Sequence, residues 1–203
     1  MHRRVAGATG GNRMSYLIIG LLLFFGVHSA GMLAPQWRER AILRVGDGAW
    51  RGLYSLGSLA GLLLLIHGFA LARAHPIVWY APSAWMHTLA RLLMLPVFPL
   101  LLASGFPGRI KSAAKHPMLA AVKLWATAHL LANGAAADVL LFGGFLAWAV
   151  CNRLSFRRRS QRPLPGAPPS KWNDLIVIVA GLTLYALMVG WAHERLFGVS
   201  PLS

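Results

Sequence analysis

The stretch KHPMLAAVKLWATAHLLANG, Lys115–Gly134, places two histidines, a lysine and an asparagine in a run that is otherwise apolar enough for a membrane. Pro117 suits the first turn of a helix, where its missing N–H costs nothing, and Asn133-Gly134 is a tight-turn pair. The stretch therefore predicts a membrane helix over Pro117–Ala132 that turns directly into the next apolar run. Its polar side chains need an explanation, because ionisable groups inside a membrane span are costly.

The whole chain has the composition of a polytopic membrane protein. Of its 203 residues, 57% are hydrophobic and only 12% are charged, and the mean hydropathy is +0.56. Soluble domains carry about 25% charged residues. The net charge of +15 comes from basic residues between apolar runs, a pattern typical of topology signals and not of nucleic-acid binding. The single cysteine, Cys151, excludes an intramolecular disulfide, and the chain has no CxxCH motif for covalent haem attachment.

Apolar runs of suitable length predict an all-α fold, a polytopic membrane helix bundle of about six transmembrane helices. We expect one membrane domain over residues 14–203, with a basic, proline-rich loop at 153–171 and a flexible polar tail at 1–13. The expected spans are 16–33, 52–72, 85–103, 117–132, 136–152 and 175–192.

Loop charges predict the orientation of these spans. Basic residues gather in the first, third and fifth loops, which the positive-inside rule assigns to the cytoplasm. Both termini are then expected in the periplasm of a bacterial inner membrane. This orientation suits a start at Met14 better than one at Met1, because the arginines of residues 1–13 oppose it. The basic fifth loop is either a topology signal or a contact with anionic headgroups.

Histidines inside the spans leave two explanations open. A membrane histidine can hydrogen-bond a facing group and stabilise helix packing by about 0.6 kcal/mol, or it can ligate a metal. His28 and His129 are the candidate pair for a non-covalent b-type haem, because two neutral imidazoles are sufficient axial ligands. Helix tilt or offset must bring them to one depth, since His28 falls toward the cytoplasm and His129 toward the outside. Ser29 and Asn133 are candidate hydrogen-bond partners for the two rings.

The fourth span has two polar faces. At about 100° per residue, His116 and Lys123 share one face. Trp125, His129 and Asn133 form an i, i+4, i+8 stripe on another face. His116 is roughly 20 Å from His129 along the axis, so these two cannot ligate the same ion. Lys123 either snorkels to the cytoplasmic headgroups or pairs with an anion such as a haem propionate.

The positions of the glycines and of the acidic residues bear on helix packing and on which other kinds of site the chain can form. Gly57 and Gly61, and the pair Gly143-Gly144, either permit close helix approach or make room for a flat ring. The five acidic residues lie in loops or near helix ends. A zinc hydrolase, a di-iron carboxylate site or a proton-driven transporter would therefore lack its carboxylates.

Several stretches together carry a family resemblance. They are GVHSAG around His28, WRGLYSLGSLAGLLLLIHGF, VWYAPSAW, KHPMLAAVKLWATAHLLANG, LLFGGFLAW and HERLFGVSPL. On these stretches the chain resembles the NnrU family of integral membrane proteins over nearly all of its length from Met14. The family often has an acid directly after Asn-Gly, where this chain has Ala135 and its first acid at Asp138.

What the resemblance implies differs between branches of the family. NnrU itself is associated with denitrification and nitric oxide metabolism. The related 15-cis-zeta-carotene isomerases carry a b-type haem with histidine ligands and isomerise a central cis double bond. Carried onto this chain, the resemblance implies His28 and His129 as haem ligands, with His116 as the alternative. The chain is then a haem protein of nitrogen-oxide respiration, a haem-dependent isomerase of a lipid-soluble substrate, or a non-catalytic accessory factor of nitric oxide reductase or another respiratory complex.

Overall fold

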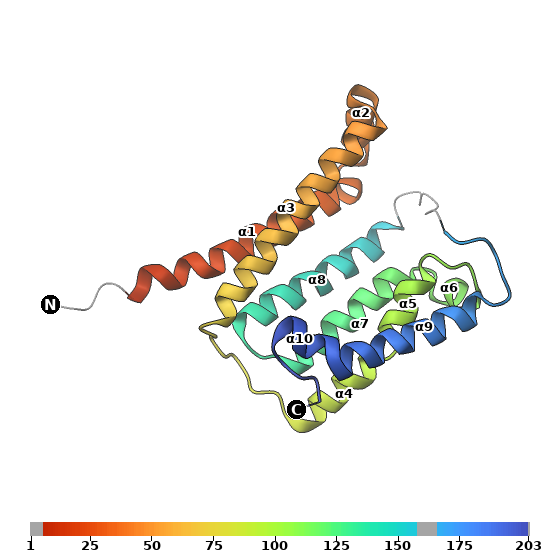
Figure 1. Cartoon of the computed structure of the whole chain (residues 1–203). Helices are drawn as coiled ribbons and strands as arrows, with labels where there is room; N and C mark the ends of the chain where they lie inside the picture. Colours follow the sequence, from red (N-terminus) through yellow and green to blue (C-terminus); the bar gives the residue numbers. More distant parts are fainter. Residues whose placement is uncertain (1–5, 158–165, 203) are drawn as a thin grey trace. The chain divides into compact units, whose positions relative to one another are not determined.

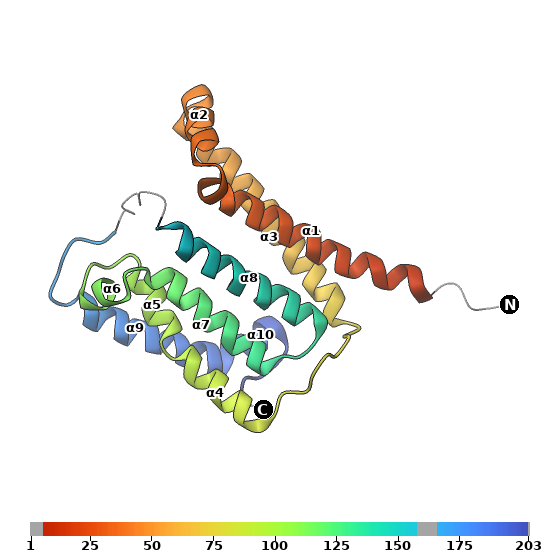
Figure 2. The same ribbon diagram turned by 180° about the vertical axis from the view of Figure 1, so that it is seen from behind.

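The computed structural model describes residues 6–157 and 166–202. The sequence-predicted tail and basic loop therefore fall partly outside the described residues, at 1–5 and 158–165. The chain divides into two compact units, residues 1–80 with 135–144 and residues 81–134 with 145–203. Within these described ranges, five helices are long and apolar enough to cross a membrane, which agrees with the predicted all-α polytopic bundle (Figures 1 and 2).

Helices account for most of the described chain, because a segment in lipid must satisfy its own backbone hydrogen bonds. The first unit contains α1 (Ala6–Leu33), α2 (Pro35–Val45), α3 (Asp47–Arg73) and the first part of α8 (Ala136–Ser155). The second unit contains α4 (Ala84–Met94), α5 (Val97–Ala103), α6 (Arg109–Ala114), α7 (Pro117–Ala132), the rest of α8, α9 (Asn173–Leu187), the π-helix η1 (Met188–Ala192) and α10 (His193–Phe197).

In the first unit, α1 and α3 lie side by side in close backbone contact (Figure 1). A Cβ added at Gly61 would lie 2.8 Å from the backbone nitrogen of Phe24, and one added at Gly68 would overlap the backbone of Leu17. The predicted use of glycine for close helix approach is therefore confirmed at Gly61. At Gly143, in contrast, no described heavy atom lies within 4 Å of the added Cβ.

The third and fourth predicted spans differ from simple long helices. The third span is broken into α4 and α5, because Pro96 has no N–H to continue the helical ladder. The fourth span, α7, has the predicted bounds but only 16 residues. At 1.5 Å per residue it is about 24 Å long, shorter than the roughly 30 Å hydrocarbon core of a bilayer.

In the second unit, α5 packs against both α7 and α9. Gly181 of α9 makes this possible, since a Cβ there would lie 2.5 Å from the backbone nitrogen of Pro99 in α5. Near the other end of α9, the hydroxyl of Tyr185 donates a hydrogen bond to the carbonyl of Arg91 in α4, at 3.1 Å. These contacts hold the broken third span against α9.

The N-terminus of α9 ties two connecting segments together, near α6 in Figure 2. The carboxylate of Asp174 accepts hydrogen bonds from the backbone N–H groups of Arg109 and Ile110, at 2.9 and 3.1 Å. Both N–H groups belong to the first turn of α6, where a backbone donor has no acceptor within the helix. The side chain of Asn173, only 3% exposed, donates to the carbonyls of Pro107 and Pro168 at 2.7 and 3.1 Å. One short motif thereby anchors both loops at this end of the unit.

Candidate functional site

His28 lies in α1 among aromatic rings. Its Nδ1 is 2.8 Å from the carbonyl oxygen of Phe24, four residues earlier. Its ring stacks on the ring of Phe24, with centroids 4.1 Å apart, and lies 5.4 Å from the ring of Tyr54 in α3. Because a carbonyl oxygen can only accept, Nδ1 carries the hydrogen, and Nε2 is the nitrogen with the lone pair in the neutral ring.

His129 lies in α7, where the predicted i, i+4, i+8 stripe forms a chain of contacts. Nδ1 of His129 is 2.9 Å from the carbonyl oxygen of Trp125. The side-chain amide of Asn133 donates to the carbonyl of His129, also at 2.9 Å. The ring of Trp125 lies 5.2 Å from that of His129 and meets Phe145 of α8 edge to face at 5.4 Å. His129 and His28 thus make the same contact, since Nδ1 of each ring lies against the carbonyl four residues earlier in its own helix.

His193 is a neighbour of His129 that the sequence analysis missed. The two ring centroids are 6.5 Å apart, with an interplanar angle of 32°. Nδ1 of His193 is 2.7 Å from the carbonyl oxygen of Val199, and its ring lies 5.0 Å from Phe197. The last span passes through η1 just before this residue, and π-helical turns are frequent at functional sites.

One signal in the sequence was available for this pair. His193 ends the last apolar run and belongs to the stretch HERLFGVSPL. Under the predicted orientation, the end of that run and the end of the fourth span lie toward the same side of the membrane. Two histidines at one depth are candidates for contact, whereas His28 was expected at a different depth.

His116 precedes Pro117 at the start of α7, as predicted. Its ring stacks on Phe156, with centroids 4.5 Å apart and an interplanar angle of 19°. Lys123 follows on the same helix and is partly exposed. Partial burial lowers the pKa of His116, and the positive charges of Arg153, Lys115 and Lys123 lower it further. Burial and these charges therefore favour the neutral form of the His116 imidazole.

The proposed site residues divide between the two units. His28 belongs to the first, whereas His116, Lys123, His129 and Asn133 belong to the second. Within the second unit, His129 and Asn133 are in contact near His193, and His116 lies at the opposite end of α7. Over the described ranges, no cluster of three or more His, Cys, Asp or Glu side chains could hold a metal ion.

In the turn before α8, the side chain of Asp138 contacts the backbone of Ala135. The carboxylate of Asp138 accepts a hydrogen bond from the backbone N–H of Ala135 at 3.3 Å. Ala135 also forms an isolated antiparallel bridge with Val78. Burial and the negative charge of Asp138 raise the pKa of the Tyr80 hydroxyl. In this chain, therefore, an acid three residues later supplies a carboxylate to the turn.

We expect the protein to be less stable at about pH 5 than at pH 7.5 because of His116. Its folded-state pKa lies below the value of 6.5 for an unperturbed histidine. Between those two values the unfolded state binds more protons, so the free energy of unfolding rises with pH across that window. The measurement is the midpoint of unfolding by sodium dodecyl sulfate in mixed micelles at the two pH values.

His116→Phe keeps an aromatic ring for the stack on Phe156 but cannot be protonated, so it should reduce the difference between the two midpoints. His75→Phe, at an exposed histidine, is the matched control and should leave the difference unchanged. An equal pH dependence in the His116→Phe variant and the original protein would contradict the assignment.

The comparisons with known proteins agree with this architecture. No curated protein and no solved structure matches the chain. A family model described as NnrU protein matches residues 16–201, a range that includes α1 from Tyr16 onward, the other membrane helices described above and all of the histidines discussed. With this match over almost the entire sequence, and with five helices suited to crossing a bilayer in the part of the chain that the structure describes, the chain belongs to the NnrU family of integral membrane proteins.

Proposed function

We propose that this NnrU-family protein binds a b-type haem through His129 and His28. The observation that carries the proposal is the state of the two rings, in each of which Nδ1 lies against a backbone carbonyl of the same helix. Histidines that ligate metals usually donate their second nitrogen in this way, which fixes the tautomer and the ring orientation. In the neutral form of each ring, Nε2 is then the nitrogen whose lone pair suits the iron.

The surroundings of both rings also suit a flat, apolar cofactor. Phe24 and Tyr54 lie beside His28, and Trp125 lies beside His129. His116, with its lowered pKa, is the alternative ligand that the resemblance suggests. A lysine in a membrane helix can pair with a haem propionate, which is the role that we propose for Lys123.

The process that we propose for this site is nitrogen-oxide metabolism in a bacterial inner membrane. A bound haem would supply an iron that can change oxidation state, and a small diatomic ligand would bind to it only in exchange for one of the two histidines. The second process compatible with such a site is a haem-dependent isomerisation of a lipid-soluble substrate, as in the related isomerase branch. In both cases the protein's own groups hold and orient the haem and keep water away from it.

A non-catalytic accessory role is the second candidate function, and one observation favours it. The ring of His28 stacks on Phe24 and approaches Tyr54 of the neighbouring helix, as a histidine that serves helix packing would. On this hypothesis the protein assists assembly of nitric oxide reductase or another respiratory complex, and its histidines stabilise the bundle. We propose periplasmic termini for either function, from the distribution of arginine and lysine in the loops.

The first measurement is an ultraviolet–visible spectrum of the detergent-purified protein, oxidised and then reduced with dithionite. We expect a Soret band and near-stoichiometric b-type haem in a pyridine haemochrome assay. His129→Ala and His28→Ala should each lose the haem, because each removes one axial nitrogen, while the protein stays inserted and monodisperse. His75→Ala removes an exposed histidine and should retain the full band.

The outcomes separate the candidate functions and the candidate ligands. Haem retained in both His28→Ala and His129→Ala would exclude this ligand pair. Haem lost in His193→Ala but kept in His28→Ala would assign the second ligand to His193, which lies near His129. A colourless protein, even after expression with added haem precursor, would favour the accessory factor.

A further inference from the structure

α2 is a basic helix that must lie at the membrane surface. It connects two candidate spans, α1 and α3, through single residues, Ala34 and Gly46. With linkers this short, the 11-residue helix cannot leave the headgroup region at the ends of the two spans. The positive-inside rule assigns this region to the cytoplasmic leaflet.

Two contacts set the rotation of α2 about its own axis. The ring of Trp37 meets Trp50 of α3 edge to face, with centroids 5.8 Å apart. The guanidinium carbon of Arg38 lies 5.9 Å from the centroid of the same Trp50 ring. None of the α2 residues is buried. One side of α2 is thus fixed against α3, and the rest of the helix is available to solvent or lipid.

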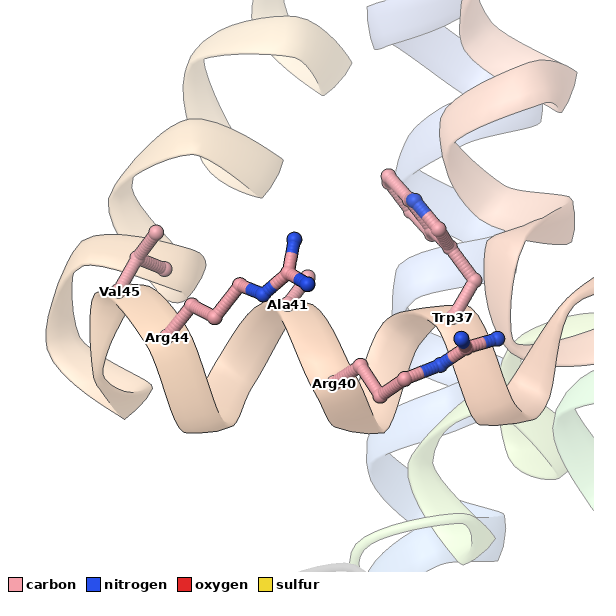
Figure 3. A pocket seen from close by; sticks show the side chains of 5 residues that line it. All are labelled: Trp37, Arg40, Ala41, Arg44 and Val45. Atoms are coloured by element: carbon pink, nitrogen blue, oxygen red, sulfur yellow. The ribbon is translucent and has the colours of Figure 1, made fainter.

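Five side chains on one side of α2 form a hollow of about 320 Å³. We call it the α2 hollow. They follow the i, i+3, i+4, i+7, i+8 spacing that aligns residues on one helix face. Figure 3 shows all five projecting from the same side of the helix. The residues are Trp37, Arg40, Ala41, Arg44 and Val45.

The hollow has two positive charges and no acid on its face. Arg40 and Arg44 are four residues apart, so their like charges repel. Among the described residues, no ion pair joins either arginine to a carboxylate, whereas nearby Arg51 pairs with Asp47 at 2.6 Å. Glu39 is the remaining acid of the segment, and its position is about 100° or more around the helix from both arginines. An anion bound between the two guanidinium groups would relieve this repulsion.

We propose that the α2 hollow binds the phosphate of an anionic glycerophospholipid headgroup. Guanidinium groups donate paired hydrogen bonds that match phosphate oxygens. Trp37 has the amphipathic ring that favours the membrane interface, and Val45 supplies an apolar wall for the glycerol region. A zwitterionic lipid also has a phosphate, but the two arginines would repel its ammonium group. The hollow therefore selects for net negative headgroups, and this site does not depend on whether the protein binds haem.

Native mass spectrometry of the detergent-purified full-length protein tests the proposal, because it resolves individual lipid-binding events. Phosphatidylglycerol and phosphatidylcholine of the same chain length are titrated separately. Each basic residue near an anionic surface contributes about a fivefold change in affinity. Replacing both arginines in R40Q/R44Q should therefore weaken the first phosphatidylglycerol event by roughly 10- to 30-fold, to the level of phosphatidylcholine.

Three controls distinguish a specific binding site from non-specific attraction by the positive charge of the segment. R109Q/K111Q removes two positive charges from another loop that is predicted to be cytoplasmic and should change the first event by no more than about twofold, since both residues lie in α6, outside the hollow. R40K/R44K keeps the positive charges and the topology signal but loses the planar guanidinium groups that donate paired hydrogen bonds. Its affinity for phosphatidylglycerol should be intermediate between those of the original protein and R40Q/R44Q. Dibrominated phosphatidylglycerol should quench a fluorescence component that is missing in Trp37→Phe.

Several results would overturn the proposal. They are equal losses in R40Q/R44Q and R109Q/K111Q, equal first-event affinities for the two lipids in the original protein, and quenching that is unchanged in Trp37→Phe. Inorganic phosphate is added as a competitor. If millimolar phosphate displaces the lipid, the hollow recognises free phosphate and the lipid assignment is wrong; if the lipid stays bound, the lipid assignment is supported.

Discussion

Replacing Gly68 with leucine is expected to force α1 and α3 apart and to lower the free energy of unfolding by about 3 kcal/mol. A Cβ at this position would lie 2.6 Å from the backbone carbon of Tyr16 and closer still to the backbone nitrogen of Leu17. Backbone atoms cannot rotate away as a flexible side chain would. The same close approach recurs at Gly20, where an added Cβ would lie 2.5 Å from the backbone nitrogen of Leu65. The helices therefore have little room to slide past each other.

Unfolding in mixed micelles of increasing sodium dodecyl sulfate content, followed by circular dichroism, measures this effect. Gly52→Leu is the matched control, because it is in the same helix and no described heavy atom lies within 4 Å of its added Cβ. It should be neutral, or stabilising by up to about 1 kcal/mol through helix propensity. Equal midpoints for Gly68→Leu and Gly52→Leu would show that α1 and α3 are not packed as described.

Asn173→Ala is expected to release the loops at the start of α9. Its buried side chain donates to two proline carbonyls, Pro107 and Pro168, from segments far apart in the sequence. Alanine leaves both acceptors without this donor, and an unsatisfied buried polar group costs about 1–3 kcal/mol. We expect a loss of about 2 kcal/mol in the same unfolding assay. Trypsin cleavage after Lys171 should also become faster, because the anchored segment opens locally.

Ser170→Ala is the control for that variant. The Ser170 hydroxyl accepts a hydrogen bond from the backbone N–H of Trp172 at 3.2 Å in the same turn, but at an exposed position. Its replacement should change stability by no more than about 0.5 kcal/mol. If both variants are cleaved after Lys171 at the rate of the original protein, the proposed anchoring role of Asn173 is wrong.

The membrane helices were predictable from the sequence, since the bilayer imposes strong local rules. An apolar run of sufficient length has to be helical in lipid, and Pro117 and Asn133 marked both ends of α7. α2 was assigned only to a loop, although Pro35 at its first turn and the spacing of Trp37, Ala41 and Val45 indicated a short surface helix. Hydropathy could not reveal it, because its arginines outweigh its apolar residues.

The candidate site was predictable only in part. The stripe from Trp125 to Asn133 follows from helical periodicity within one segment, so spacing was sufficient to find it. The neighbour of His129 was not predictable in this way, because His193 is distant in sequence and follows the wider turns of η1. A change of helical register in one segment alters which face its later residues present. The pattern of apolar residues does not indicate this change of register.

By itself, the sequence determined the fold class, the approximate spans and the family resemblance, and it led to the histidines that we propose as cofactor ligands. Those features depend on local chemistry: hydropathy, helical period, proline and the types of ligand atoms. Only the tertiary structure decided which glycines meet a neighbouring backbone, which carbonyls accept from Asn173 and which ring lies near His129. These contacts join segments that are far apart in the chain. Their geometry depends on side-chain and backbone packing over distances of a few ångströms, which cannot be predicted from local sequence patterns.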